Sequence, residues 1–559
     1  MSRILISLFV LLGLLTPAFG PPAAAAVSAP AVSASSKPRA TVAGSYLKLA
    51  NGSVRVVLNS ASKKVTLRYR DGAGRTRTTS VAIRAGHGNA LLAAGATQVE
   101  AKAAATSTRR TGTYQRLPAL TAPVGLRAAP GANRVDLAWS TAPGVVQWQV
   151  FRRATATSAW QPATTVTRPQ ATITGLPSGQ VVQLAVAALA DGPRTPLSAA
   201  VSAIPSAPAR QVATSKNHTC AVMADSSVEC WGSNALGQLG DGTQNPHRTA
   251  HRVPGVTGAT MVAAGSMHTC ALLGDGTVTC WGTLPFGLVG PTPEEPEFTG
   301  SRPLPVAGLT DVTAITTGDA HACALRRNGE VLCWGFNSYG QLANGGVIAS
   351  SHPSLVAGLP RATSISAGWQ HTCATVVGGQ AYCWGGNSSG QLGDGTTKQR
   401  FAPVRVAGLT GATSISAGGL HSCARLGDGT LRCWGANTAG QLGDGTLVSR
   451  TTPAPVRRLT GAVAVTTGNA HTCARLRDSV SCWGLNGTGA LGDGTARFRA
   501  MPTPMLGSTH AVGLSAMGAD HTCVIIAGGT VACTGLNHRG QLGDGTLTTR
   551  TSLVRVRGL

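Results

Sequence analysis

The sequence lacks any internal stretch apolar enough to cross a membrane, and acidic residues are scarce. Its 559 residues contain 21 Asp and Glu against 46 Lys and Arg, which gives a net charge of +25. No Gly-rich phosphate loop, paired-carboxylate motif or strained serine elbow is present. We therefore expect a protein that is not an enzyme, that binds no cofactor or metal, and that has no transmembrane segment beyond an N-terminal signal.

Cysteine is absent from the first 219 residues and then recurs in a regular pattern. Each of seven cysteine pairs begins with a His-x-Cys triplet, and successive triplet histidines are 50, 53, 50, 50, 50 and 50 residues apart. A period near fifty with strand-like segments inside it is typical of propellers and related arrays. The triplet histidines are His218, His268, His321, His371, His421, His471 and His521.

The N-terminus has the pattern of a secretory signal. Arg3 precedes the apolar run Ile4 to Leu15, and small residues follow up to Ala26. We predict a signal peptide over residues 1–26, with an uncleaved anchor as the alternative, and an Ala/Pro/Ser linker over residues 27–41. These features indicate an exported bacterial protein, either extracellular or associated with the cell wall.

The paired cysteines are predicted to form disulfides, because compartments beyond the membrane are oxidising and none of the 14 is left over. Zinc is the alternative, since a histidine and two cysteines per repeat supply three ligands, but no fourth ligand is evident. The predicted bridges are Cys220–Cys230, Cys270–Cys280, Cys323–Cys333, Cys373–Cys383, Cys423–Cys433, Cys473–Cys482 and Cys523–Cys533.

The positive charge is concentrated in the front of the chain. Residues 1–205 carry 22 basic and 4 acidic side chains, whereas residues 206–559 carry 24 and 17. A basic region outside the cell favours contact with an anionic cell-wall polymer or membrane surface. The alternative is that these side chains are simply solvated.

Residues 42–117 are predicted to form a small basic β region. Polar and apolar residues alternate over Ser53 to Leu58, Lys64 to Tyr69 and Thr79 to Arg84, and Asp71-Gly72 marks a turn. The stretch Ala90 to Ala105 is rich in alanine and fits a helix or a loose linker equally well.

Residues 118–205 show short strands separated by turn residues, as a β-sandwich requires. Trp139 ends the second strand and Trp148 lies in the third, both at positions expected for the core. The pattern resembles a fibronectin type III module, although Val182 stands where that family has its corner tyrosine. The resemblance implies a spacer or adhesive unit without chemistry of its own.

Residues 206–559 contain the repeats. In the fifth, four short strands are predicted at Pro403 to Leu409, Ala412 to Ala417, His421 to Leu426 and Leu431 to Gly435. Four strands in each of seven periods predict an all-β fold with a seven-bladed β-propeller, because each blade can bury its faces only against its neighbours.

The cysteine spacing fixes the register of one hairpin in each repeat. If Cys423 faces Cys433, the loop is Gly427 to Gly429, and its last position needs a left-handed residue. In the sixth repeat the cysteines are nine apart, and a two-residue loop, Arg477-Asp478, keeps them opposite.

The two ends of the repeat region suggest how the propeller closes. The first repeat begins abruptly at Arg210, and the chain finishes with a strand-like segment, Ser552 to Leu559. We expect this C-terminal strand to complete the first blade.

Over about 350 residues the chain resembles the repeats of the regulator of chromosome condensation family. The motifs that carry the resemblance are GxxHxCAL, DGTVxCWG, NxxGQLGDGT and PxxVxGL. The resemblance implies a seven-bladed propeller closed by the C-terminal strand. The family's best-known activity, guanine nucleotide exchange, needs an intracellular GTPase and conflicts with export. Exported bacterial propellers that resemble a β-lactamase inhibitory protein offer an enzyme-inhibitor precedent.

Function should reside in what varies between repeats, because the histidines, tryptophans and Asp-Gly-Thr runs recur as framework. The two residues before each triplet histidine vary most, and we expect them to converge on one mouth of the propeller. Trp369 is the strongest candidate, since large aromatics dominate binding energy at interfaces. The candidate face comprises Lys216, Asn217, Met267, Asp319, Trp369, Gln370, Leu420, Asn469 and Asp520.

These observations predict a secreted, monomeric, non-catalytic scaffold that binds an unidentified protein through the propeller mouth. The alternative is binding of carbohydrate or an anionic cell-wall polymer through the basic N-terminal region. Exchange-factor or enzyme-inhibitor activity has less support.

Overall fold

The computed structural model describes two compact units, Met1–Pro118 and Ala119–Leu559. The predicted signal peptide and linker, residues 1–41, lie outside the described residues. In the part of the chain that is described, every regular element is a strand, and no helix is long and apolar enough to cross a membrane. The described residues are 42–48, 54–60, 64–82, 87–92, 96–103, 115–116, 119–131, 133–140, 145, 147–177, 180–189, 194–203, 205, 207–283 and 300–559.

The first unit contains two antiparallel sheets, in strand orders β1-β2-β5 and β4-β3-β6-β7. Val65 and Leu67 on β3 pack with Val99 and Ala101 on β6 in its core. Two strands occupy the alanine-rich stretch, so the helix-or-linker prediction was wrong: alternate small residues face the core there. The strands are β1 (Val42–Lys48), β2 (Val54–Ser60), β3 (Lys64–Arg70), β4 (Thr76–Ala82), β5 (His87–Leu92), β6 (Thr97–Ala103) and β7 (Gln115–Arg116).

The second unit begins with two further antiparallel sheets, in strand orders β12-β9-β8 and β11-β10-β13-β14. Trp139 and Trp148 are buried and meet edge to face with ring centroids 6.2 Å apart, which confirms their core positions. The fibronectin type III assignment stays a prediction. The strands are β8 (Arg127–Gly131), β9 (Arg134–Ala138), β10 (Gln147–Arg153), β11 (Gln161–Val166), β12 (Gln170–Thr174), β13 (Val182–Leu189) and β14 (Val201–Ala203).

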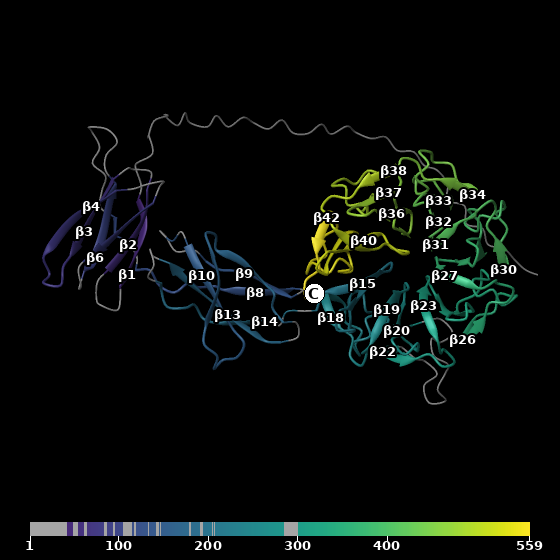
Figure 1. Ribbon diagram of the computed structural model, residues 1–559, viewed down its shortest axis with the longest axis horizontal. Helices are drawn as coiled ribbons and strands as arrows, with labels where there is room; N and C mark the ends of the chain where they lie inside the picture. The colour runs from purple at the N-terminus through teal and green to yellow at the C-terminus, as the bar shows by residue number, and fades with distance from the viewer. Residues whose placement is uncertain are drawn as a thin grey trace, which may run out of the picture. The chain divides into compact units, whose positions relative to one another are not determined.

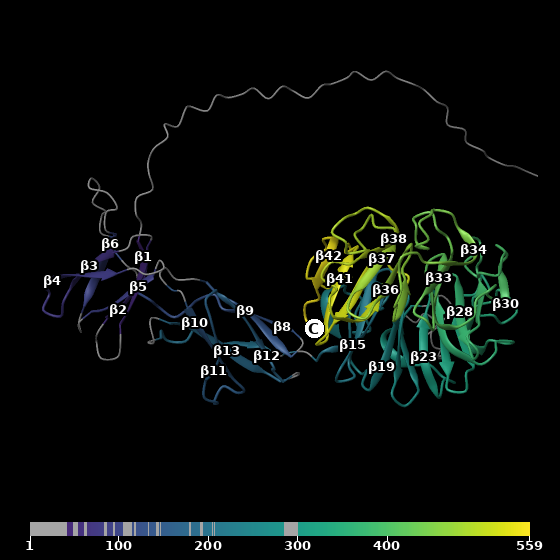
Figure 2. The same cartoon turned by 45° about the horizontal axis from the view of Figure 1, so that its top comes forward.

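The repeats form seven four-stranded antiparallel sheets, whose strands pair in chain order. They follow one another around a common centre, and both views place the seventh sheet beside the first (Figures 1 and 2). The first is β15 (Ala209–Thr214), β16 (His218–Met223), β17 (Val228–Gly232) and β18 (His247–Arg252); the second is β19 (Ala259–Ala264), β20 (His268–Leu273), β21 (Val278–Gly282) and β22 (Gly300–Pro305); the third is β23 (Val312–Thr317), β24 (His321–Arg326), β25 (Val331–Gly335) and β26 (Ser350–Leu355).

The remaining four sheets repeat this order. The fourth is β27 (Ala362–Ala367), β28 (His371–Val376), β29 (Ala381–Gly385) and β30 (Arg400–Arg405); the fifth is β31 (Ala412–Ala417), β32 (His421–Leu426), β33 (Leu431–Gly435) and β34 (Arg450–Pro455); the sixth is β35 (Ala464–Thr467), β36 (His471–Arg475), β37 (Val480–Gly484) and β38 (Arg499–Pro504); the seventh is β39 (Ala511–Ser515), β40 (His521–Ile526), β41 (Thr530–Gly535) and β42 (Arg550–Arg555).

The C-terminal strand does not complete the first sheet, so that prediction was wrong. β42 pairs with β41, with Val554 opposite Cys533, while the first sheet has its own outer strand, β18. The same shift applies to every repeat, since Val404 pairs with Cys383 in the fourth sheet rather than starting the fifth. The chain turns back after each Asp-Gly-Thr loop and pairs with the strand it has just left, as antiparallel strands readily do.

The predicted hairpins and disulfides are confirmed. Cys423 lies opposite Cys433, and Gly429 closes the turn with φ +79°. In the sixth sheet the shorter loop keeps Cys473 opposite Cys482. All seven bridges are formed within single sheets, and the fourteen cysteines are therefore accounted for.

The glycine of each Cys-Trp-Gly run permits a close approach between strands. Gly435 has φ +101°, and a Cβ there would lie 2.6 Å from the carbonyl oxygen of Leu420. We expect Gly435→Ala to lower the free energy of unfolding by roughly 2–4 kcal/mol through backbone strain and this clash. Chemical denaturation followed by tryptophan fluorescence measures the loss. Gly487→Ala is the matched control, because a Cβ at Gly487 meets nothing within 4 Å; equal losses in both variants would contradict the explanation.

Candidate functional site

The candidate residues lie in the connection between the first and second strands of each sheet. A glycine three residues before the histidine brings neighbouring connections together. At Gly368 a Cβ would lie 2.4 Å from the carbonyl oxygen of Gly418 in the next sheet and 2.5 Å from the His371 ring. Only glycine permits this approach, so the connections of the second to sixth repeats are drawn in against their neighbours; the first repeat has Ser215 at this position.

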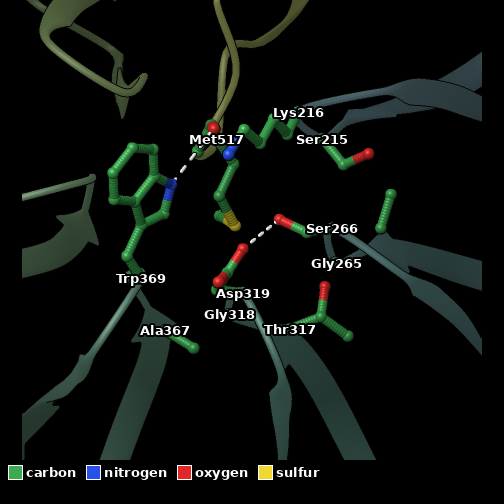
Figure 3. A pocket seen from close by; sticks show the side chains of 13 residues that line it. Ser215, Lys216, Gly265, Ser266, Thr317, Gly318, Asp319, Ala367, Trp369 and Met517 are labelled. Atoms are coloured by element: carbon green, nitrogen blue, oxygen red, sulfur yellow. Dashed lines mark hydrogen bonds between the residues drawn. The ribbon is translucent and has the colours of Figure 1, made fainter. Parts of the chain in front are cut away.

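A depression is formed where these connections meet, and three predicted residues, Lys216, Asp319 and Trp369, line it together (Figure 3). They come from the first, third and fourth sheets, so residues about 150 positions apart are brought to one place. Ser266 from the second sheet and Met517 from the seventh complete the wall.

Trp369 reaches from the fourth sheet to the seventh. Its indole Nε1 donates a hydrogen bond to the carbonyl oxygen of Gly518, 3.3 Å away. The Lys216 ammonium lies 5.4 Å from the Trp369 ring centroid, within the range of a cation–π interaction. The ring is only half-buried and therefore retains surface for a ligand.

Met517 is the residue that sequence reasoning missed. In the fifth sheet Ser416 pairs with Cys423, seven positions on, whereas in the seventh Ser515 pairs with Cys523, eight positions on. The extra residue is Met517, and its Sδ lies 4.0 Å from the Thr316 hydroxyl of the third sheet. The run Ser-Ala-Met-Gly in place of Ser-Ala-Gly was the available signal.

Two side-chain pairs join neighbouring connections. Ser266 donates a short hydrogen bond to Asp319, and Asn469 Nδ2 donates to Asp520 Oδ1 over 3.0 Å. The depression thus carries an exposed ammonium from Lys216 and a half-buried carboxylate from Asp319, next to an indole and a thioether. Such a lining can accept a ligand that presents both apolar and charged groups.

The other predicted residues, Asn217, Met267, Gln370, Leu420, Asn469 and Asp520, do not line the depression. Several are fixed instead by their backbone, because the carbonyl oxygen accepts from the amide that follows a Cys-Trp-Gly run. The Leu420 oxygen, for example, accepts from the amide of Ala436 over 2.9 Å. Their part in a binding face stays a prediction.

Beneath the connections, the triplet residues form hydrogen bonds between sheets. His421 Nε2 bonds the Thr472 hydroxyl over 2.9 Å, and that hydroxyl donates to the carbonyl oxygen of Gln441 over 2.8 Å. Trp483 Nε1 donates to the same oxygen over 3.0 Å. Since the hydroxyl proton goes to Gln441, the histidine must donate from Nε2. These residues therefore link neighbouring sheets.

The aspartates of the Asp-Gly-Thr loops are also satisfied by the protein. Asp394 accepts from Asn387, Thr396 and Arg400. Burial raises the pKa of Asp394, but the hydrogen bonds from Thr396 and Arg400 outweigh it, so the pKa lies below its usual value. The carboxylate is therefore charged and fully engaged at neutral pH.

Comparison with known proteins identifies the repeat region. A family model described as the RCC1-like domain matches residues 174–516. Solved structures with a similar fold include yeast RCC1 (Prp20) bound to Kap60, with 21% identity, TM-score 0.52, and 59% of this chain and 83% of that chain covered. Human WBSCR16 matches with 18% identity, TM-score 0.53, and 68% and 99% covered. No curated protein matches the chain in sequence.

The triplet histidines make stability depend on pH. Burial lowers the pKa of His421 to about 3 and that of His471 to about 4, well below the 6.5 expected when unfolded. At a pH between the folded and unfolded pKa values, the unfolded chain binds more protons than the folded protein does. The free energy of unfolding should therefore fall as the pH drops below 6.5, by up to about 1.4 kcal/mol per pH unit for each histidine.

Urea denaturation at pH 7.5 and 5.0 tests this dependence, and we expect a loss of at least several kcal/mol. In His421→Gln, which keeps a side-chain N–H donor but does not titrate, the loss should be smaller. A stability that is flat between these pH values would contradict the burial of neutral histidines.

Proposed function

Because the chain belongs to the RCC1-like domain family, we propose that residues 206–559 form a closed seven-bladed propeller that serves as a protein-binding scaffold. The observation that carries this proposal is the gathering of Lys216, Asp319, Trp369 and Met517, all from variable positions, above a framework that repeats in every sheet.

Closure is supported by the contacts between the first and last sheets. His521 Nε2 bonds the Thr219 hydroxyl over 2.7 Å, and Trp231 Nε1 donates to the Gln541 carbonyl oxygen over 2.9 Å. These bonds are of the same kinds as those between the fifth and sixth sheets. The proposed ring is therefore closed by side-chain packing without an exchanged strand.

A protein partner is supported by the relatives and by the chemistry of the depression. Yeast Prp20 has been crystallised with Kap60, and Prp20p has been studied for binding to Gsp1p and histones. In this chain the half-buried indole of Trp369 supplies an apolar anchor, and Lys216 and Asp319 supply charges of both signs. Interfaces typically combine such an aromatic anchor with a polar surround.

Export to an oxidising compartment is supported by the seven disulfides, which persist under such conditions. It places the partner outside the cell and leaves guanine nucleotide exchange and enzyme inhibition as weaker candidates. We propose a non-catalytic role, because six of the seven buried histidines and the aspartates of the Asp-Gly-Thr loops are already engaged by framework bonds.

Binding of an anionic polymer by the N-terminal region is the second candidate. Exposed arginines lie on the hairpin of β3 and β4, and this observation favours it. Part of their charge is neutralised, since Arg75 and Arg77 both bond Asp71, and Arg68 pairs with Glu100. A polymer held in this way should be released by salt within the physiological range.

The proposed function predicts that Trp369 is a binding hot spot. A partner is first isolated from the exported fraction by cross-linking to the full-length protein and identified by mass spectrometry. Trp369→Ala should then weaken the measured affinity at least tenfold, whereas Trp369→Phe, which keeps an aromatic ring, should lose less.

Phe498→Ala is the matched control, because Phe498 is an exposed aromatic that does not line the depression. Thermal unfolding of each variant separates a binding defect from a folding defect. If Trp369→Ala folds and binds as tightly as the wild type, the depression is not the binding site.

A further inference from the structure

Among the described residues, one interface between repeat sheets lacks two side-chain hydrogen bonds that recur at the others. A triplet histidine bonds a hydroxyl of the next sheet at six interfaces, from His218–Thr269 to His521–Thr219. At the interface between the second and third sheets, the hydroxyl position is occupied by Ala322. We call this interface, β19–β22 against β23–β26, the seam.

A second recurring bond is also missing there. At five interfaces a Ser or Thr hydroxyl near the end of the first strand accepts from a backbone amide of the neighbouring sheet, as Ser416 does from Thr467. Between the first and second sheets, Gln211 replaces it with two hydrogen bonds to Val262. At the seam, Met261 offers only a thioether, 3.5 Å from the Ile315 amide.

The missing hydroxyl leaves a buried polar group unsatisfied. Both ring nitrogens of His268 are buried and have no hydrogen-bond partner among the described residues. The other six triplet histidines are equally buried, but each keeps a bond from Nε2. A buried donor without a partner destabilises the state that buries it, and separation of the two sheets would let water satisfy it.

In the part of the chain that the structure describes, the seam is held by apolar packing, by a hydrogen bond from the Val312 amide to the Gly276 carbonyl oxygen that has counterparts at the other interfaces, and by a polar contact at the mouth. Ile315 and Trp334 from the third sheet pack in one cluster with Val278 and Leu272 from the second. The polar contact is Ser266, which bonds Asp319 through both its backbone amide and its hydroxyl. Each sheet is stapled internally by its own disulfide, so the two sheets can part as intact units.

We propose that the propeller opens at the seam: the second and third sheets separate before any other neighbours, and Ser266–Asp319 is the latch at the mouth. This inference rests on the closed propeller proposed above. One of the seven interfaces between sheets is thus the place where the conformational change begins. The latch residues line the depression, so the mobile interface reaches the candidate binding site.

Hydrogen exchange of the full-length oxidised protein, read by mass spectrometry, tests the proposal. Peptides covering β20 and β24 should exchange faster than the equivalent strands β28, β32 and β36. Ala322→Thr restores the hydroxyl found in neighbouring repeats and should slow exchange at the seam by about five- to tenfold, the effect of one buried hydrogen bond.

Ala322→Val is the matched control, because valine has the shape of threonine without the hydroxyl. The seam should be slowed by threonine and not by valine. In the reciprocal variant, Thr372→Ala, His321 loses its partner, and exchange should become faster at the interface between the third and fourth sheets.

Uniform exchange across the seven sheets, or equal slowing by threonine and valine, would overturn the seam. A different failure identifies the proposed function as the error: if β15 and β40 exchange fastest, the first and last sheets are not stably joined. That result would contradict the closed ring on which the seam depends. If β15 is protected and exchange is uniform across the other sheets, only the seam is contradicted.

Discussion

The hydroxyl in the middle of six of the seven His-x-Cys triplets is the group on which the repeat architecture depends. Thr472 illustrates its position: it accepts from His421 of the preceding sheet and donates to the carbonyl oxygen of Gln441, in the loop between the third and fourth strands of that sheet. Trp483, next to the second cysteine, donates to the same carbonyl. Four repeated residue types are thus tied by one small network of buried hydrogen bonds.

This network explains why the fold can tolerate variation at its centre. Because the sheets are joined by buried hydroxyls and tryptophans, and each is held together by its own disulfide, the connections above them contribute little to the joining. Five of them need a glycine for close approach, as at Gly368, but the two positions before the histidine are free to change in every repeat. Trp369 and Lys216 occupy such positions, and so a chemically distinct depression is built on a uniform frame.

The sequence predicted local structure well and the unit of repetition poorly. The bridge Cys473–Cys482 was predictable, because strand pairing has a period of two and a single loop separates the partners. The boundaries of the repeating unit were not predictable. A period of about fifty residues shows that four strands recur, but it does not show which of them begins a sheet, and β42 was therefore assigned to the wrong sheet.

The candidate site was predictable only in part. Counting back from the histidine found Lys216, Asp319 and Trp369, but it skipped Met517, which lies before the glycine where the seventh repeat is one residue longer. The contact of Trp369 with Gly518 spans the depression between distant sheets. Such a contact depends on how the whole series of sheets curves, and the sequence of a single repeat does not show that curvature.

The framework network has a direction, since six of the seven triplet histidines bond the following sheet and five of the six tryptophans donate to the loop of the preceding one. His521 and Trp231 continue this polarity across the chain ends with the same partners. In the proposed closed ring, packing is cyclic while the polypeptide is linear, so the place where the repeat region begins and ends is a matter of connectivity alone. A circularly permuted chain, with its ends moved to another junction between sheets, retains every complementary pair.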